Sequence, residues 1–308
     1  MIIFIETLKS SLLMLPLFIG IYLIVEILIK NYIINYKTRN LFRLKWSPIL
    51  ATTLGLVPKN DFSLLVCDYY FDKKATLGAF VAIFIASSDD AIPVLLGNYS
   101  KASDLLIILG IKILVAISLG FVVDLITYKY QTKNYKEFVN EQNRVIDNLE
   151  INGVSSSLVI QDANSEKTLK EKNGDNSWVK EYFIPAFLHS VAIFFIVLIT
   201  SLVYNYVANG MGKQQFASLL NSFLWYQPFI IGLLAMIPSF ASSVVITQIY
   251  ALGGISMGAL ITGLCVNSTV VFWTFYKKTK NKSGVIILLL AIYIVSVLVG
   301  IFITALGL

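Results

Sequence analysis

The side chains with the greatest chemical interest in this chain are a few charged groups placed inside long apolar runs. Asp89 and Asp90 lie in the sequence SSDDAIP, two-thirds of the way along one run, and Lys112 lies inside the next. An ionisable group at that depth in a membrane costs about 2.5 to 3.5 kcal/mol on insertion scales, so each is a hypothesis for a functional site. Consecutive helical residues point about 100° apart, so one aspartate is expected to face the site and the other a partner. Lys112 is the expected partner, because a desolvated carboxylate needs a nearby cation or a proton.

The oxygen-bearing side chains around this pair favour a hard cation. Ser88 precedes the two aspartates, and the stretch Asn267-Ser268 stands at the corresponding place in the second half of the chain. Carboxylate, amide and hydroxyl oxygens suit ions such as Mn²⁺, so Asp89 and Asp90 are the predicted metal ligands. Two structural interpretations stay open: an ion pair that locks two helices together, and serine hydroxyls that bond back to their own helix.

Two proline-broken segments, residues 46–71 and 225–251, are expected to help position these groups. Each holds two apolar runs of about ten residues, too short to cross a membrane singly. Such a segment forms either a re-entrant hairpin or a pair of short tilted crossings, and its broken helix ends offer main-chain carbonyls to a cation and N–H groups to an anion. Asn60 and Asp61, at the first break, therefore join the predicted site. Asp61 is alternatively only a helix cap.

The two broken segments belong to an internal repeat. The stretch that begins at Ser47 aligns without a gap with the stretch that begins at Gln227. Paired apolar segments interrupted by proline in corresponding halves indicate the binding site of a transporter, so Pro58, Pro238, Ser63 and Ser243 are predicted hairpin positions. The identical pairs are Pro48/Pro228, Pro58/Pro238, Ser63/Ser243, Tyr70/Tyr250, Gly78/Gly258, Ala79/Ala259 and Ser88/Ser268.

The composition indicates that most of this chain is embedded in lipid. It is 57% hydrophobic and 14% charged, with a mean hydropathy of +0.76, whereas an ordinary soluble domain has roughly 25% charged residues. The predicted fold class is an all-α polytopic membrane protein of about ten helical segments. It consists of two inverted repeats, each with three long transmembrane helices and a proline-broken hairpin. The predicted long helices are Leu8–Leu28, Thr76–Leu96, Leu105–Ile126, Phe183–Val207, Ser256–Tyr276 and Val285–Leu306.

Residues 1–127 and 181–308 are predicted to form the two repeats, joined by a mobile linker at 128–180. The linker is rich in Lys, Asn, Glu and Ser. Lys and Arg gather on one side of the predicted bundle, which places the linker in the cytoplasm and both termini outside the cell membrane. The first apolar run is long enough to span and lacks a cleavage site, so it is expected to be retained.

Several classes of protein and site are disfavoured. Cys67 and Cys265 are not equivalent in the repeat and predict neither a disulfide nor a thiolate metal site. The lone His189, near a span end, is expected to be structural or interfacial. No phosphate-binding loop and no soluble basic domain occur, so neither ATP hydrolysis nor nucleic-acid binding is predicted. The expected partners are the lipid bilayer and a small ion or solute, with no cofactor; a homo-oligomer is compatible with the sequence.

The motifs together resemble a family of bacterial permeases described as ten-helix heavy-metal exporters, often labelled manganese transporters or arsenic-permease-like proteins. The resemblance rests on GLVP and FS, TLGAFVAIFIASSDDAIP, IPSFASSVVITQIY and GISMGA. The family has Gln-Cys-Gly and Asn-Cys after its hairpin prolines, where this chain has Lys59-Asn60-Asp61 and Ser239-Phe240. It also has a His-rich central loop and an acidic residue in place of Gln248. These departures argue against a soft metal held by thiolates.

The predicted function is secondary transport, with export of a manganese-like divalent cation coupled to protons or another ion. An alternative is an exporter or flippase for an organic anion or lipid-linked phosphate, favoured by Lys59, Lys112 and the N-termini of the hairpin helices. An intramembrane enzyme is a third class; it is disfavoured because the chain has one peripheral histidine and no glutamate at depth.

Overall fold

The described part of the chain is built from helices, without a strand. The computed structural model describes residues 2–28, 46–58, 61–87, 90–98, 100–151, 179–237, 239, 241–267 and 269–307. The first half contains α1 (Ile2–Leu28), α2 (Ser47–Gly55), α3 (Asp61–Phe71), α4 (Leu77–Ala86), α5 (Ala91–Gly97) and α6 (Asp104–Ile151). A π-helical turn, η4 (Val179–Phe183), leads into the second half, with α8 (Ile184–Met211), α9 (Lys213–Ser222), α10 (Gln227–Ala235), α11 (Ala241–Ala251), α12 (Met257–Val266), α13 (Thr269–Lys278) and α14 (Lys282–Ala305).

Six helical stretches in these described ranges are long and apolar enough to cross a membrane, which confirms the predicted all-α polytopic class. They coincide with the six predicted runs to within a few residues at each end. The stretches are Ile3–Ile27, Leu77–Gly97, Asp104–Tyr128, Ile184–Met211, Met257–Lys278 and Lys282–Ala305. The shorter apolar helices Phe62–Phe71 and Ala241–Ala251 and a bent pair formed by α9 and α10 complete the apolar set.

The second and fifth stretches differ from the prediction because each is divided into two helices. α4 ends at Ala86 and α5 begins at Ala91, while α12 ends at Val266 and α13 begins at Thr269. Ser87, which follows α4, has φ −52° and ψ 122°, outside the helical region. Ser, Asn and Asp compete with helical main-chain bonds through their own side chains, which explains a break in SSDD and in the matching NST.

The constant spacing of the repeat found in the sequence is also present in the helix boundaries. Three helices of the first half, α2, α3 and α4, begin and end at the residues that the gap-free alignment pairs with the ends of α10, α11 and α12. The matching extends to the caps: the hydroxyls of Thr76 and Ser256 accept from the amides of Ala79 and Ala259 at 3.0 and 3.2 Å. An N-cap hydroxyl satisfies one of the free N–H groups of a first helical turn.

Glycine allows the buried helices α4 and α12 to lie directly on α6 and α14. A Cβ atom added at Gly78 would stand 2.1 Å from the carbonyl oxygen of Gly120, and one at Gly258 would stand 2.1 Å from that of Gly300. At the first contact the Asp124 carboxylate also accepts from the Gly78 amide and the Thr76 hydroxyl, both at 2.8 Å. The core of the bundle therefore centres on α4 and α12, whose residues are buried from Gly78 to Ala86 and from Met257 to Val266.

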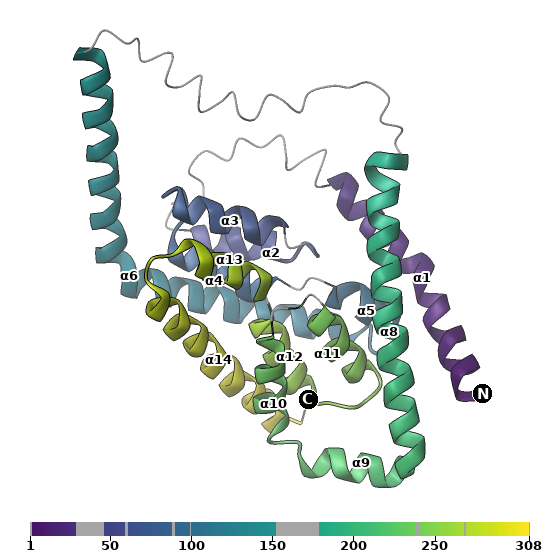
Figure 1. Ribbon diagram of the computed structural model, residues 1–308. Coiled ribbons are helices and arrows are strands. Elements are labelled where there is room, and N and C mark those ends of the chain that lie inside the picture. The colour runs from purple at the N-terminus through teal and green to yellow at the C-terminus, as the bar shows by residue number, and fades with distance from the viewer. Residues whose placement is uncertain are drawn as a thin grey trace.

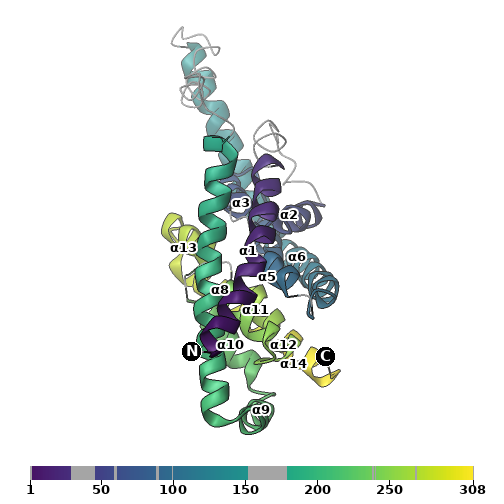
Figure 2. The ribbon, with the colours of Figure 1, turned by 90° about the vertical axis from the view of Figure 1, so that its right-hand side faces the viewer.

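The helices α1 and α8 lie side by side and run in opposite directions, as Figures 1 and 2 show. They also pack against α5 and α11, whereas α3 packs against α13 in another part of the bundle. Helix α6 continues to Ile151, so the segment predicted as a linker starts as a helix; residues 152–178 lie outside the described residues.

The glycine contacts give a testable prediction. Gly78→Ala and Gly258→Ala are each expected to destabilise the protein by about 1 to 3 kcal/mol, because the new methyl group overlaps a facing main-chain oxygen. Thermal unfolding of the detergent-solubilised protein measures the effect. Gly110→Ala on α6 is the matched control, since no atom lies within 4 Å of the added Cβ. Equal stability of Gly78→Ala and Gly110→Ala would contradict the close approach.

Candidate functional site

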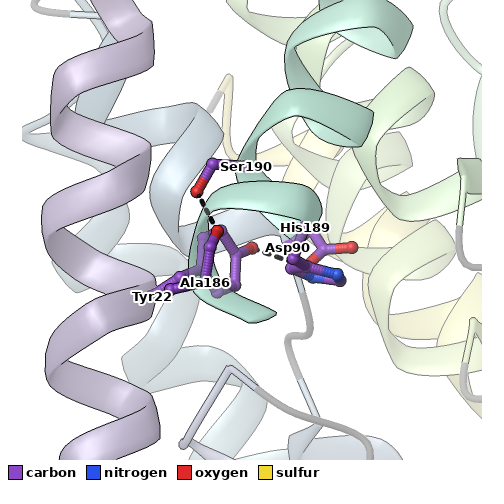
Figure 3. Close-up of polar contacts among 5 residues, drawn as sticks. All are labelled: Tyr22, Asp90, Ala186, His189 and Ser190. Carbon is purple, nitrogen blue, oxygen red and sulfur yellow. Dashed lines mark hydrogen bonds and ion pairs between the residues drawn. The ribbon is translucent and has the colours of Figure 1, made fainter. Parts of the chain in front are cut away.

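A buried carboxylate forms the centre of the candidate site. Asp90 immediately precedes α5 and is 4% exposed, and its side chain does not cap that helix. It instead lies between α1 and α8, one helix from each half of the chain (Figure 3). The break between α4 and α5 thus brings the aspartate to the packed face of a helix pair that is remote in sequence.

Two side chains converge on the same oxygen of this carboxylate. The Tyr22 hydroxyl of α1 donates to Asp90 Oδ1 at 2.5 Å, and His189 Nε2 of α8 lies 2.9 Å from the same atom. The rings of Tyr22 and His189 meet edge to face, with centroids 4.5 Å apart. Tyr22 is 4% exposed, while the His189 side chain is 47% exposed, so the imidazole connects a buried carboxylate to the outside of the bundle.

This arrangement can hold and exchange a positive charge. Two donors directed at Oδ1 stabilise an ionised carboxylate, since hydrogen bonds to a charged acceptor are roughly twice as strong as neutral ones. Imidazole and carboxylate are both groups that proteins use to carry protons, and here they are in direct contact. The same carboxylate oxygen and imidazole nitrogen are ligands for divalent metals.

Lys112 occupies a second, wholly buried position between the two halves. It is 0% exposed, and its Nζ donates to the carbonyl oxygens of Ser87 at 2.6 Å and Leu264 at 3.3 Å. Ser87 follows the last residue of α4, and Leu264 lies in the last turn of α12. An ammonium is favoured at the carbonyl end of a helix, and here one ammonium serves two such ends. Lys112 was the expected partner of one of the two aspartates. Asp90 is bonded to Tyr22 and His189, and Asp89 lies outside the described residues, so a pairing of Asp89 with Lys112 stays a prediction.

The structure accounts for some of the other predicted site residues. Asn267 is 5% exposed at the end of α12, where the Ser242 hydroxyl contacts its amide oxygen. Ser63 and Ser243 are buried at equivalent positions of α3 and α11, and Pro58 lies just beyond α2. Asp61 begins α3, but its side chain lies outside the described part, as do Asn60, Ser88, Asp89, Pro238 and Ser268 in full.

Sequence reasoning missed both partners of Asp90. His189 was expected to be structural or interfacial, and Tyr22 was not singled out. Neither residue has a matching side chain in the repeat, since the equivalent positions hold Leu202 and Lys9. The available signal was a single histidine inside an apolar span, and its meaning depends on the packing of α1 against α8.

Within the described residues no group of three or more His, Cys, Asp or Glu side chains is placed to hold a metal ion. Cys67 and Cys265 are both 0% exposed and unpaired in disulfides. The pair of Asp90 and His189 thus offers a carboxylate oxygen and an imidazole nitrogen, with a phenol nearby, and no thiolate. This donor set suits a temporarily bound ion better than a structural metal centre.

Fold and site together define an α-helical multi-pass membrane protein with a charged cluster in its interior. Comparison with known families then shows that the chain belongs to the family described as "Putative, 10TM heavy-metal exporter", whose model matches residues 1–192. That range includes Tyr22, Asp90, Lys112 and His189. Searches of curated proteins and of solved structures gave no match.

Removal of the buried ammonium gives the prediction for this site. Lys112→Met is expected to lower the unfolding temperature by roughly 5 °C or more, because two buried carbonyls lose a donor at a cost of about 1 to 3 kcal/mol each. Thermal unfolding in detergent is the measurement. Lys9→Met, which removes an exposed lysine from α1, is the control and is expected to change little. A Lys112→Met protein as stable as the parent would contradict the bridging role.

Proposed function

We propose that this protein exports a manganese-like divalent cation from the cytoplasm in exchange for protons, with Asp90 and His189 as the exchange group. The observation that carries the proposal is the convergence of Tyr22 and His189 on one oxygen of a buried aspartate. In one orientation of the transporter the carboxylate–imidazole pair holds the cation. In the other it holds a proton, because the same groups cannot keep both positive charges in a poorly solvated site.

The ligand types favour a borderline or hard divalent ion over a soft one. Both cysteines are buried away from Asp90's partners, and the groups around the carboxylate are oxygen and nitrogen donors. Manganese accepts carboxylate and imidazole ligands, whereas soft ions select thiolates. A site with few protein ligands also suits cargo, since an ion that must be released cannot be bound as tightly as a structural one. The family description supports a metal ion as the cargo.

Alternating access between two inverted halves is the proposed mechanism. The repeated bounds of three helices support a repeat, and the antiparallel course of α1 and α8, which are equivalent in that repeat, supports its inversion. The halves correspond to residues 1–127 and 181–308, with 128–180 as a cytoplasmic connection and both termini outside. Movement of one half against the other would then expose the carboxylate to each side in turn.

Transport of an organic anion or lipid-linked phosphate receives less support. That alternative depends on Lys59, which lies outside the described residues, and on Lys112. The Lys112 ammonium is wholly buried and donates to two main-chain carbonyls, so it is directed at the protein's own helix ends. A cation bound by Asp90 is the function that the described contacts favour.

The exchange role predicts different effects for the two members of the pair. In proteoliposomes with an imposed proton gradient, Asp90→Asn is expected to reduce Mn²⁺ exchange more than about tenfold, because it removes the only charge of the pair that binds a cation. His189→Gln keeps a hydrogen-bond donor and cannot titrate, so transport is expected to persist with a flatter dependence between about pH 5 and pH 8.

Ser190→Ala is the matched control for these variants. Ser190 is next to His189 on α8, and its hydroxyl donates to the Ala186 carbonyl of its own helix at 2.7 Å (Figure 3). Exchange by this variant is expected to equal that of the parent. Full Mn²⁺ exchange by Asp90→Asn would overturn the assignment of the carboxylate.

The identity and direction of the cargo are tested in cells. A strain lacking this gene is expected to become sensitive to one divalent metal, Mn²⁺ in the first instance, and to accumulate it. Growth across a series of Mn²⁺, Zn²⁺, Co²⁺ and Ni²⁺ concentrations, with intracellular metal content measured, gives the answer. The native gene is expected to restore resistance, and the Asp90→Asn gene is not. Unchanged content of every metal in the deletion strain would refute export.

A further inference from the structure

The two halves of the chain contact each other along two equivalent helix pairs. In the α3/α13 seam, α3 of the first half packs against α13 of the second; in the α5/α11 seam, α11 of the second half packs against α5 of the first. Helix α11 is the repeat equivalent of α3, and α13 is the repeat equivalent of α5 to within a few residues. The α5/α11 seam is therefore the repeat equivalent of the α3/α13 seam.

Among the described residues, a polar contact joins the helices of each seam, and the two contacts use the same positions of the repeat. At the α3/α13 seam, Lys278 Nζ lies 2.5 Å from Asp68 Oδ1. At the α5/α11 seam, Asn98 Nδ2 donates to Gln248 Oε1 at 3.2 Å. The gap-free alignment of the repeat pairs Asp68 with Gln248 and Asn98 with Lys278. The contact is thus repeated, while its chemistry changes from an ion pair to a pair of neutral amides.

The surroundings of the two contacts differ as much as their charges. The Asp68 and Lys278 side chains are 55% and 45% exposed. Gln248 is 2% exposed, and its Nε2 also donates to the Ser201 hydroxyl of α8 at 2.9 Å. An exposed ion pair is weak and is screened by salt, whereas a contact between neutral amides carries no net charge for salt to screen.

We infer that these two contacts are the opposing gates of the transporter, with an ionic gate at the α3/α13 seam and an amide gate at the α5/α11 seam. This inference rests on the proposed function, in which the two halves move against each other. An inverted repeat places equivalent seams toward opposite sides of the membrane, so opening of either seam admits one side only. Both contacts are made in this structure.

The ionic gate is assigned to the cytoplasmic side. It adjoins the lysine-rich turn after α13, and Lys and Arg are enriched in cytoplasmic loops. Its half-exposed pair separates with little loss because water and salt replace the interaction, while the amide gate depends on Gln248, which is 2% exposed and is also held by Ser201 of its own half. Because the cytoplasmic gate is the easier one to open, the site opens more readily to the cytoplasm. That is the side from which an exporter takes up its cargo.

Two equivalent buried residues can report the opening of each gate. Cys67 precedes Asp68 on α3, and Thr247 precedes Gln248 on α11; both are 0% exposed. In the full-length protein in vesicles, the first reporter is native Cys67 in a Cys265→Ala background. The second is Thr247→Cys combined with Cys67→Ser and Cys265→Ala. The rate of alkylation by neutral N-ethylmaleimide measures how often each reporter becomes accessible.

Salt is expected to act on one gate alone. Raising NaCl from about 0.05 M to about 1 M shortens the Debye length to about 3 Å and is expected to speed Cys67 alkylation about two- to fivefold. Alkylation of Thr247→Cys is expected to stay constant. The double variant Asp68→Gln with Lys278→Asn, which copies the amide gate, is expected to abolish the salt effect on Cys67. Exchange of the two charges by Asp68→Lys with Lys278→Asp is expected to retain it.

The matched control removes another ion pair of the same region. Lys74 and Asp72 are paired at 3.4 Å in the turn after α3, are comparably exposed and do not join the two halves. Asp72→Asn with Lys74→Gln is therefore expected to leave the salt effect on Cys67 unchanged. The converse variant, Asn98→Lys with Gln248→Asp, is expected to confer a salt effect on Thr247→Cys; if it does not fold, the Asp68 and Lys278 variants decide alone.

A salt-independent rate at Cys67, or a salt effect that survives Asp68→Gln with Lys278→Asn, would overturn the ionic gate. These measurements use no cargo, so they separate the gates from the proposed function. The expected alkylation pattern without Mn²⁺ exchange would support the gates and refute the cargo. Mn²⁺ exchange that depends on Asp90, together with salt-independent alkylation, would support the proposed cargo and refute the gates.

Discussion

The ammonium group of Lys112 makes the broken architecture of this protein possible. Helices that stop inside a hydrocarbon layer leave main-chain carbonyls without partners, and each such group costs several kcal/mol unless it is satisfied. Here two helices, α4 and α12, stop in the interior, and one buried lysine donates to a carbonyl at the end of each. The breaks that direct Asp90 toward α1 and α8 depend on this interaction, because without it the two ends would face each other as like partial charges.

Around this interaction the structure repeats its framework without repeating its chemistry. Glycine contacts, hydroxyl caps and the bounds of three helices recur at the constant spacing of the repeat. The positions equivalent to Asp90 and Lys112, however, hold Val270 and Ile292. Backbone geometry constrains small residues and caps in both copies, since a methyl group or a missing acceptor is as costly in one half as in the other. A second aspartate at position 270 would add a charge where the repeat has Leu202 in place of Tyr22 as a hydrogen-bond donor.

Sequence patterns were informative wherever one residue type has one physical meaning. Runs of apolar residues located the six spans, identical residues at a fixed spacing located the repeat, and Lys112 was recognised because a buried charge is costly. Less could be predicted where side chains from distant helices meet. The breaks after Ala86 and Val266 lie within stretches whose hydropathy is that of a continuous span. Tyr22 and His189 are unremarkable in the sequence, and their convergence on Asp90 results from the packing of α1 against α8.

The placement of α1 and α8 has an energetic consequence of its own. Under the proposed alternating access, two halves identical in sequence and packing would have opposite-facing conformations of equal free energy, and this chain departs from that symmetry in its side chains and in the packing of α1 and α8. In this structure α1 packs against α5 and α8 packs against α11, while neither α1 nor α8 packs as extensively against the equivalent helices α3 and α13. If the two halves move as proposed, this asymmetry of packing gives the two orientations unequal free energies and favours one of them before any ion or gradient acts.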